Sequence, residues 1–158
     1  MSFIINLLCA FGGTLAFTIL FNIDRTFYLY CGLTGMAGWA VYLAVEPHTS
    51  ATVATLVGSL VVVFLSRIFS MWKKCPITVF MIAGIFPLIP GSSIYYMAYY
   101  FVIGDYIQAA LKGIEAIKIS FAIVAGIHVI DSIPPKIFKK KYWAELRIKL
   151  RGYLQGKR

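Results

Sequence analysis

Charge is scarce in this sequence: only 13% of its 158 residues are Asp, Glu, Lys or Arg, whereas 60% are hydrophobic. A soluble domain has roughly 25% charged and about 45–50% apolar residues, and a chain of this size has no interior that could bury such an apolar excess. A soluble globular enzyme is therefore excluded. Disorder is excluded as well, because disordered chains are poor in apolar and aromatic residues. The composition indicates an integral membrane protein.

Motifs of enzymes and metal sites are missing too. The chain has no HExxH, no G-x-S-x-G and no Walker loop, and no two carboxylates have a spacing suited to acid–base catalysis or to a metal ion. Its three cysteines, Cys9, Cys31 and Cys75, form no CxxC motif, and an odd number argues against a disulfide framework. We therefore expect a protein that is not an enzyme and that has no metal and no cofactor.

Long uncharged runs predict an all-α bundle that crosses the membrane five times, because about 20 apolar residues cross a bilayer as a helix. The expected spans are residues 3–22, 27–45, 49–68, 76–104 and 113–133. They make up a transmembrane domain over residues 1–135, which a basic cytoplasmic tail over residues 136–158 follows. Residues 1–13 contain no Lys or Arg, so the basic start of a secretory signal is missing and the first span is expected to be retained.

The basic residues predict the topology. With five spans, thirteen of the fifteen Lys and Arg residues lie on one side of the membrane, and only Lys112 and Lys118 lie on the other. Cytoplasmic loops carry the excess of basic residues. We therefore expect a multi-pass protein of the cell (inner or plasma) membrane with its N-terminus outside and its C-terminus in the cytoplasm. A basic tail beside so many apolar runs indicates contact with membrane lipids and no nucleic acid.

The fourth run contains the most distinctive motif, since residues 86–93 read Phe-Pro-Leu-Ile-Pro-Gly-Ser-Ser. A proline lacks the N–H group and clashes with the carbonyl four residues back, so the helix is expected to break between Pro87 and Gly91. Pro90 should free the carbonyl of Phe86. Gly91 should allow unusual backbone angles, and Ser92 should cap the second half-helix.

A break at membrane depth predicts a binding site, because unpaired backbone groups persist there only inside protein or beside a watery cavity. A half-helix N-terminus attracts an anion, and discontinuous helices form substrate sites in secondary transporters. The candidate substrate-binding residues are Pro87, Pro90, Gly91, Ser92, Ser93 and Tyr95. The alternative is a proline kink that only shapes the helix. For the following Tyr99 and Tyr100, an aromatic belt at the outer interface is favoured.

Small residues recur along the second and third spans. They include Gly32, Gly35, Gly38 and Gly58, with the hydroxyls of Thr55 and Ser59 nearby. Small residues let membrane helices approach closely, so these four glycines are predicted to pack helices together. The alternative, that these ridges line a pathway for a polar solute, remains open.

Few ionisable residues lie inside the spans. His128 and Asp131 are one helical turn apart near the cytoplasmic end of the fifth span, and intramembrane ionisable groups are candidates for proton coupling. The alternative is that Asp131 simply ends the helix. Glu115 and Lys118 are expected to form an i,i+3 ion pair. Near the inner end of the first span, Asp24 and the neighbouring Asn22 are either caps or part of a gate.

Three segments together resemble the threonine/serine exporter family: Phe21-Asn22, the glycine-rich stretch from Cys31 to Trp39, and the proline–glycine segment from Phe86 to Ser92. More narrowly, the chain is similar over roughly residues 3–133 to the small membrane subunit of the two-gene (split) form. The resemblance implies a secondary exporter of two five-helix halves, driven by the proton motive force. This chain would be one half, and a larger partner subunit would be the other. Family members tend to have a proline shortly after Phe-Asn, where this chain has Asp24.

The resemblance implies L-threonine and L-serine as substrates in some members and dicarboxylates such as succinate in others. A dicarboxylate favours two cationic anchors, preferably arginines, and no arginine lies inside the expected spans, with Arg67 at a boundary. We therefore favour export of the amino acids, with export of succinate as the alternative. A further hypothesis is a membrane scaffold that transports nothing and docks a partner or lipid. A homo-oligomer is an additional possibility.

Overall fold

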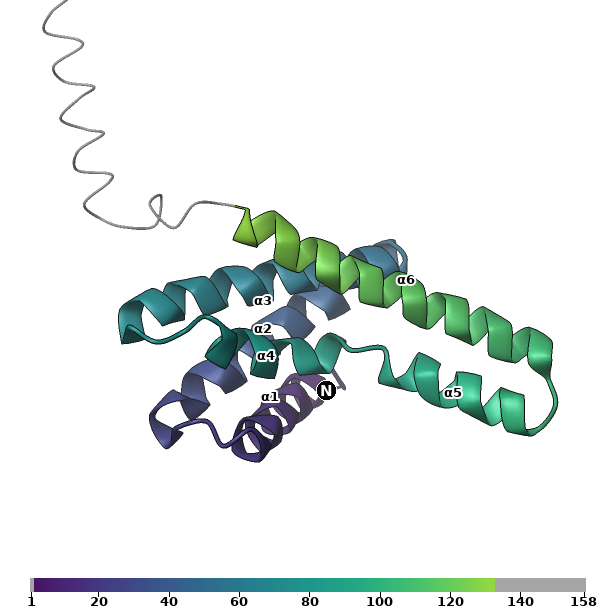
Figure 1. Ribbon diagram of the computed structural model, residues 1–158, viewed down its shortest axis with the longest axis horizontal. Helices are drawn as coiled ribbons and strands as arrows, with labels where there is room; N and C mark the ends of the chain where they lie inside the picture. Colours follow the sequence, from purple (N-terminus) through teal and green to yellow (C-terminus); the bar gives the residue numbers. More distant parts are fainter. Residues whose placement is uncertain (1, 133–158) are drawn as a thin grey trace, which may run out of the picture.

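The structure, a computed structural model, describes residues 2–132, and within them all regular structure is helical (Figure 1). The elements are α1 (Ser2–Leu20), η1 (Arg25–Phe27), α2 (Tyr28–Val45), η2 (Glu46–His48), α3 (Ala51–Lys73), α4 (Thr78–Ile85), η3 (Phe86–Leu88), α5 (Gly91–Val102) and α6 (Tyr106–Asp131). The predicted basic tail over residues 136–158 lies outside the described residues.

Among the described residues, α1, α2, α3 and α6 are each long and apolar enough to cross a membrane. The pair formed by Thr78–Leu88 and Gly91–Val102 meets the same test when taken together, with a bend of 49° between its parts. The prediction of an all-α polytopic bundle with a broken fourth span is therefore confirmed. The chain is a multi-pass membrane protein.

Two helices extend beyond the ranges that the uncharged runs indicated. The third helix continues to Lys73 and ends at Lys74, which adopts the left-handed conformation at φ 54°. The sixth begins at Tyr106, where the carboxylate of Asp105 accepts the N–H of Gln108 at 3.1 Å. Charged residues such as Lys112 end a hydrophobic run without ending a helix, because straight-chain charged residues are good helix formers.

The second helix is at the centre of the bundle and packs against α1, α3 and α4, while α3 packs against α6. Two buried clusters fill the interior. In the first, Leu88 of η3 joins side chains of α3 and α6, namely Val62, Ile119 and Ile123. In the second, Phe80 and Ala83 of α4 pack on Cys31 of α2. The broken segment is therefore fixed on both sides by buried apolar contacts.

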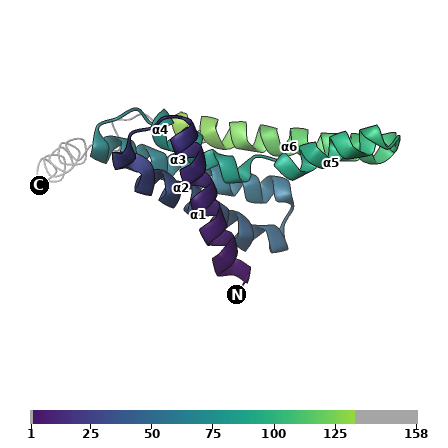
Figure 2. The ribbon, with the colours of Figure 1, turned by 90° about the horizontal axis from the view of Figure 1, so that it is seen from below.

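The last two helices form an arm. The fifth helix packs on α6 and has no other substantial contact with the described residues. In Figures 1 and 2, α5 and the N-terminal part of α6 extend side by side beyond α1, α2 and α3. Figure 2 also shows α1 inclined steeply to this arm. Only Ser93 of α5 is buried.

The turns after α1 and α3 meet at one end of the bundle. The ammonium group of Lys73 lies 4.5 Å from the ring centroid of Tyr30 in α2. The rings of Phe27 and Phe80 pack edge to face at 5.6 Å, which joins the start of α2 to α4. Arg25, Lys73 and Lys74 therefore lie at the same end of the molecule.

Candidate functional site

The break in the fourth span is a short irregular segment. The N–H of Ile89 donates to the carbonyl of Phe86 at 3.2 Å, and the N–H of Gly91 donates to that of Ile89 at 2.7 Å. The expectation that Pro90 leaves the Phe86 carbonyl free is therefore wrong. Because η3 is a 3₁₀ turn, the carbonyl of Phe86 accepts the N–H of the residue three positions ahead and not the one four positions ahead. The segment changes direction while keeping part of its backbone paired.

Two further expectations about the break are wrong. The cap of α5 is Pro90, at φ −75° and ψ 54°, and no side chain caps the helix, so Ser92 does not act as the cap. Gly91 does not have a positive φ, since Gly104 is the glycine with that conformation among the described residues. Pro90 lacks the N–H that would continue the helix, which accounts for the interruption at this point.

The six candidate substrate-binding residues do not converge on one enclosed cavity. Pro90 and Ser93 are buried, and Pro87 is half-buried. By contrast, Gly91, Ser92 and Tyr95 are exposed, with 65% of Tyr95 accessible. A Cβ atom added at Gly91 would meet nothing within 4 Å. The described chain therefore presents one open side of the break.

A cleft of 130 Å³ lies on the other side of the break, between α1 and η3. It is lined by Cys9, Ala10, Gly13, Phe17, Phe86 and Pro87. The rings of Phe17 and Phe86 stack with centroids 3.6 Å apart, and the ring of Phe21 lies 5.5 Å from that of Phe86. These three rings, which we call the aromatic trio, cover the break where it faces α1.

Sequence reasoning missed Phe17 as a neighbour of the break. Its i,i+4 spacing from Phe21 was the available signal, because such pairs share one helix face. That spacing does not say which helix lies opposite. The contact with Phe86 is visible only once α1 is packed on η3.

The four glycines of the second and third spans lie against neighbouring helices. Gly32 faces the ring of Phe11, and Gly35 faces Thr14, both in α1. Gly38 and Gly58 face each other, since a Cβ on Gly58 would lie 3.0 Å from the Gly38 carbonyl oxygen.

The hydroxyls near these glycines are bonded within their own helices. Thr55 donates to the carbonyl of Ala51 at 2.8 Å, and Ser59 donates to that of Leu56 at 2.8 Å. On α1, Thr14 and Thr18 donate in the same way, each at 2.7 Å. These donors are therefore occupied, although each oxygen keeps its capacity to accept.

The ionisable residues of α6 are placed differently from the expectation. Glu115 pairs with Lys112 at 2.8 Å and not with Lys118. Both lysines are three residues from Glu115 and therefore one helical turn away, so the spacing alone did not decide between them. His128 and Asp131 are exposed in the last turn of α6. The carbonyl of His128 accepts the hydroxyl of Ser132 at 2.8 Å.

A polar recess of 620 Å³ lies at the corner between α1 and α2. It is lined by Ile19, Asn22, Ile23, Asp24, Arg25 and Tyr28. The carboxylate of Asp24 accepts the backbone N–H of Thr26 at 2.9 Å and caps η1. Hydrogen bonds from that N–H and from the Thr26 hydroxyl hold the pKa of Asp24 below its usual value. The carboxylate is therefore ionised at neutral pH.

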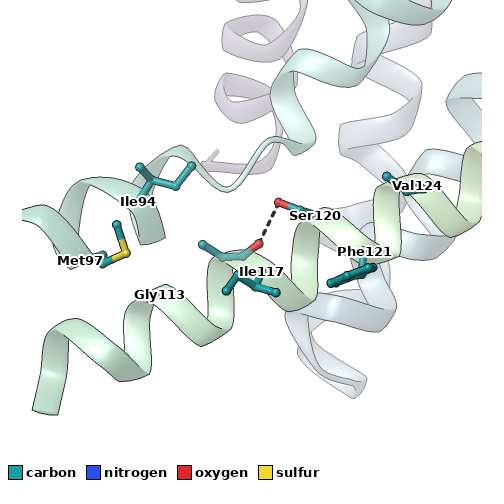
Figure 3. A pocket seen from close by; sticks show the side chains of 8 residues that line it. Ile94, Met97, Gly113, Ile117, Ser120, Phe121 and Val124 are labelled. Carbon is teal, nitrogen blue, oxygen red and sulfur yellow. Dashed lines mark hydrogen bonds between the residues drawn. The ribbon is translucent and has the colours of Figure 1, made fainter.

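A longer groove runs between α5 and α6 and has a volume of 590 Å³ at its inner part, which Figure 3 shows from close by. Its lining is apolar, with Ile94 and Met97 on α5 facing Ile117, Phe121 and Val124 on α6. The single hydroxyl there, that of Ser120, donates to the carbonyl of Ala116 at 2.9 Å. The groove offers a polar solute little to bind, so we place the candidate site at the break.

Residues 6–133 of the chain match the model of a family described as "Threonine/Serine exporter, ThrE". Neither the curated proteins nor the solved structures contain a match to the chain. The matched range includes the break, the aromatic trio and the polar recess, and it ends near the C-terminus of α6.

Proposed function

The chain belongs to the threonine/serine exporter family, and from that premise we propose that it forms one half of a secondary exporter of L-threonine and L-serine. This is a family of transporters and not of enzymes. A larger five-helix subunit of the same family would supply the other half, and the proton motive force would drive export. The cell membrane is the proposed location, with the N-terminus outside.

The observation that carries this proposal is the broken helix in an otherwise apolar span. In the first turn of α5 the N–H of Gly91 donates to the carbonyl of Ile89, whereas the N–H groups of Ser92 and Ser93 come before the first intrahelical acceptor. The helix dipole adds a partial positive charge there. An amino-acid carboxylate is the kind of group that such an N-terminus binds. Gly91 gives a ligand close access to this backbone, because among the described residues nothing other than its two chain neighbours and the backbone of its own helix lies within 4 Å of its missing Cβ.

The open side of the break supports a two-subunit exporter. Ser92 and Tyr95 are exposed on α5, which among the described residues packs mainly on α6. A polar solute at membrane depth needs protein or water around it. We therefore propose that the partner subunit completes the site opposite Ser92 and Tyr95. Proton coupling through His128 and Asp131 belongs to the same proposal.

The first experiment isolates the chain from its native host in a mild detergent and identifies what copurifies by mass spectrometry. The proposal predicts a larger multi-span protein, and the pair is then tested for efflux of labelled threonine, serine and succinate. Recovery of this chain alone, as a stable oligomer, would contradict the two-subunit proposal. Efflux of succinate without efflux of either amino acid would contradict the proposed substrates.

The decisive variant is Gly91→Leu, because Gly91 is exposed and a Cβ atom there meets nothing within 4 Å among the described residues. Export should fall to the background rate while the amount of assembled complex stays unchanged. The matched control is Gly12→Leu on α1, where a Cβ also meets nothing within 4 Å. If the Gly91 variant exports normally, the break is not the substrate site.

A further inference from the structure

From the polar recess at the α1–α2 corner, we infer a second solute site, which binds a zwitterionic amino acid between Asp24 and Arg25 before it reaches the broken helix. The inference rests on the proposed function for its role in export. The binding itself needs only this chain, because all six residues that line the recess come from one corner. Because binding needs only this chain, an experiment can refute binding at the recess without refuting the exporter function, and the reverse.

Asp24 and Arg25 are adjacent in the sequence and carry opposite charges, yet they form no ion pair. Among the described residues, the ion pair is that between Lys112 and Glu115. The carboxylate of Asp24 is instead directed at the N–H of Thr26, which caps η1. One anion and one cation therefore line the same recess without neutralising each other. That arrangement is complementary to a molecule that carries both charges.

The backbone of the corner is held in place. The N–H of Asn22 donates to the carbonyl of Ile19 at 2.9 Å, and the N–H of Ile23 donates to that of Thr18 at 3.2 Å. Asn22 itself adopts the left-handed conformation at φ 53°, which asparagine tolerates better than most residues. The side chains around the recess therefore extend from a hydrogen-bonded turn that follows the last residue of α1.

Each group in the recess matches a part of serine or threonine. A guanidinium binds a carboxylate through two parallel hydrogen bonds, which assigns the solute carboxylate to Arg25. The solute ammonium group is assigned to Asp24. The Asn22 amide can both donate to and accept from a hydroxyl, and Ile19 and Ile23 provide apolar contact for the methyl group of threonine. A dicarboxylate would bring a second negative charge towards Asp24.

The location of the recess suits recruitment of solute by an exporter. It is at the end of the bundle where Arg25, Lys73 and Lys74 gather, and basic loops face the cytoplasm. In the proposed orientation, solute arrives from that side. The recess would therefore raise the local concentration of amino acid at the cytoplasmic end of the subunit.

The test measures binding to the full chain, purified in detergent, by isothermal titration calorimetry. The probes are L-threonine, its methyl ester (ammonium only), N-acetyl-L-threonine (carboxylate only) and succinate. Asp24→Asn should weaken binding of threonine and of the ester about tenfold, and Arg25→Gln should weaken binding of threonine and of the N-acetyl compound about tenfold, in line with the loss of a hydrogen bond to a charged group. Succinate should bind more weakly than threonine.

Two matched variants remove the same charges elsewhere. Lys73→Gln removes a cation at the same end, and Glu46→Gln removes an anion from η2. Both should leave all four affinities within about twofold of the parent, because neither residue lines the recess and both are exposed, so that salt screens their charges. A crossed pattern confined to Asp24 and Arg25 distinguishes direct contact from a general change of potential.

Three results would overturn the inference: no threonine binding by the chain, unchanged binding in both recess variants, or equal losses in the two control variants. If binding is unchanged in the recess variants while Gly91→Leu stops efflux, this site is refuted and the proposed function is unaffected. If the crossed pattern is found and the assembled pair exports no amino acid, the binding site holds and the proposed function fails.

Discussion

At the scale of single residues, helix approach depends on the absence of side chains at a few positions. A Cβ atom on Gly35 would lie 2.9 Å from Cγ2 of Thr14 and closer still to its hydroxyl oxygen. That hydroxyl donates to the carbonyl of Ala10 at 2.7 Å. Even one methyl group on Gly35 therefore requires either a new rotamer of Thr14 or a wider separation of α1 and α2.

This contact predicts that Gly35→Ala lowers the free energy of unfolding by about 1–3 kcal/mol, the usual effect of overpacking a tight interface. Thermal unfolding of the purified chain in one detergent measures the change. Gly12→Ala is the control: its added methyl group meets nothing within 4 Å, and alanine favours the helix by up to about 1 kcal/mol. Equal stability of the two variants would show that α1 and α2 are not in contact at Gly35.

At the scale of elements, Thr78–Leu88 and α5 meet at a bend of 49°, which we attribute to Pro87 and Pro90. Replacing both with alanine restores two N–H donors and removes two steric clashes. We expect α4 and α5 to join into a straighter helix and export to be lost. Spin labels at positions 78 and 102, in a chain whose three cysteines are replaced by alanine, should move apart, as measured by pulsed electron paramagnetic resonance.

The control for this straightening is Pro47→Ala in η2, outside the broken span, which should leave the distance between the two labels unchanged. A Pro87→Ala, Pro90→Ala variant with the parent distance would mean that packing of Leu88 in the core, and not the prolines, sets the bend. Leu88 is only 3% exposed among side chains of α3 and α6.

For the broken segment, part of the structure could be predicted from the sequence and part could not. Apolar run lengths predicted the helices, and the two prolines predicted the break, because both effects act within one stretch of chain. The aromatic trio was not predicted, since Phe17 and Phe86 meet only through the packing of α1 on η3. The cap at Pro90 and the partner of Glu115 were also missed. The helix α5 begins without a side-chain cap, and Glu115 has a lysine three residues away on either side, of which it pairs with Lys112.

At the polar recess, the sequence predicted alternatives between which the structure decides. The sequence left Asn22 and Asp24 as either caps or part of a gate. In the structure Asp24 is a cap, because its carboxylate accepts the Thr26 N–H at 2.9 Å. It also lines the recess beside Arg25. The residue type and spacing of Asp24 do not predict that it both caps η1 and lines the recess. Both roles follow from the position of the turn after α1.

At the scale of the whole molecule, the polar and charged turns separate into two ends. Arg25 and Lys73 are at one end, with the recess, while the tip of the arm, at Gly104 and Asp105, is at the other (Figure 1). Among the described residues, one orientation therefore places the basic turns with Arg25, Lys73 and Lys74 in the cytoplasm. The opposite orientation would conflict with the known bias of basic loops.

This separation predicts the result of labelling with a membrane-impermeant maleimide. In a chain without its native cysteines, Gln108→Cys at the exposed start of α6 should react in intact cells. Lys73→Cys, exposed at the end of α3, should react only after the membrane is permeabilised. The reverse pattern would place the recess outside the cell, where it could not recruit solute for export. Equal labelling of both positions in intact cells would indicate a mixed orientation, in which case the recess would face the cytoplasm in only part of the population.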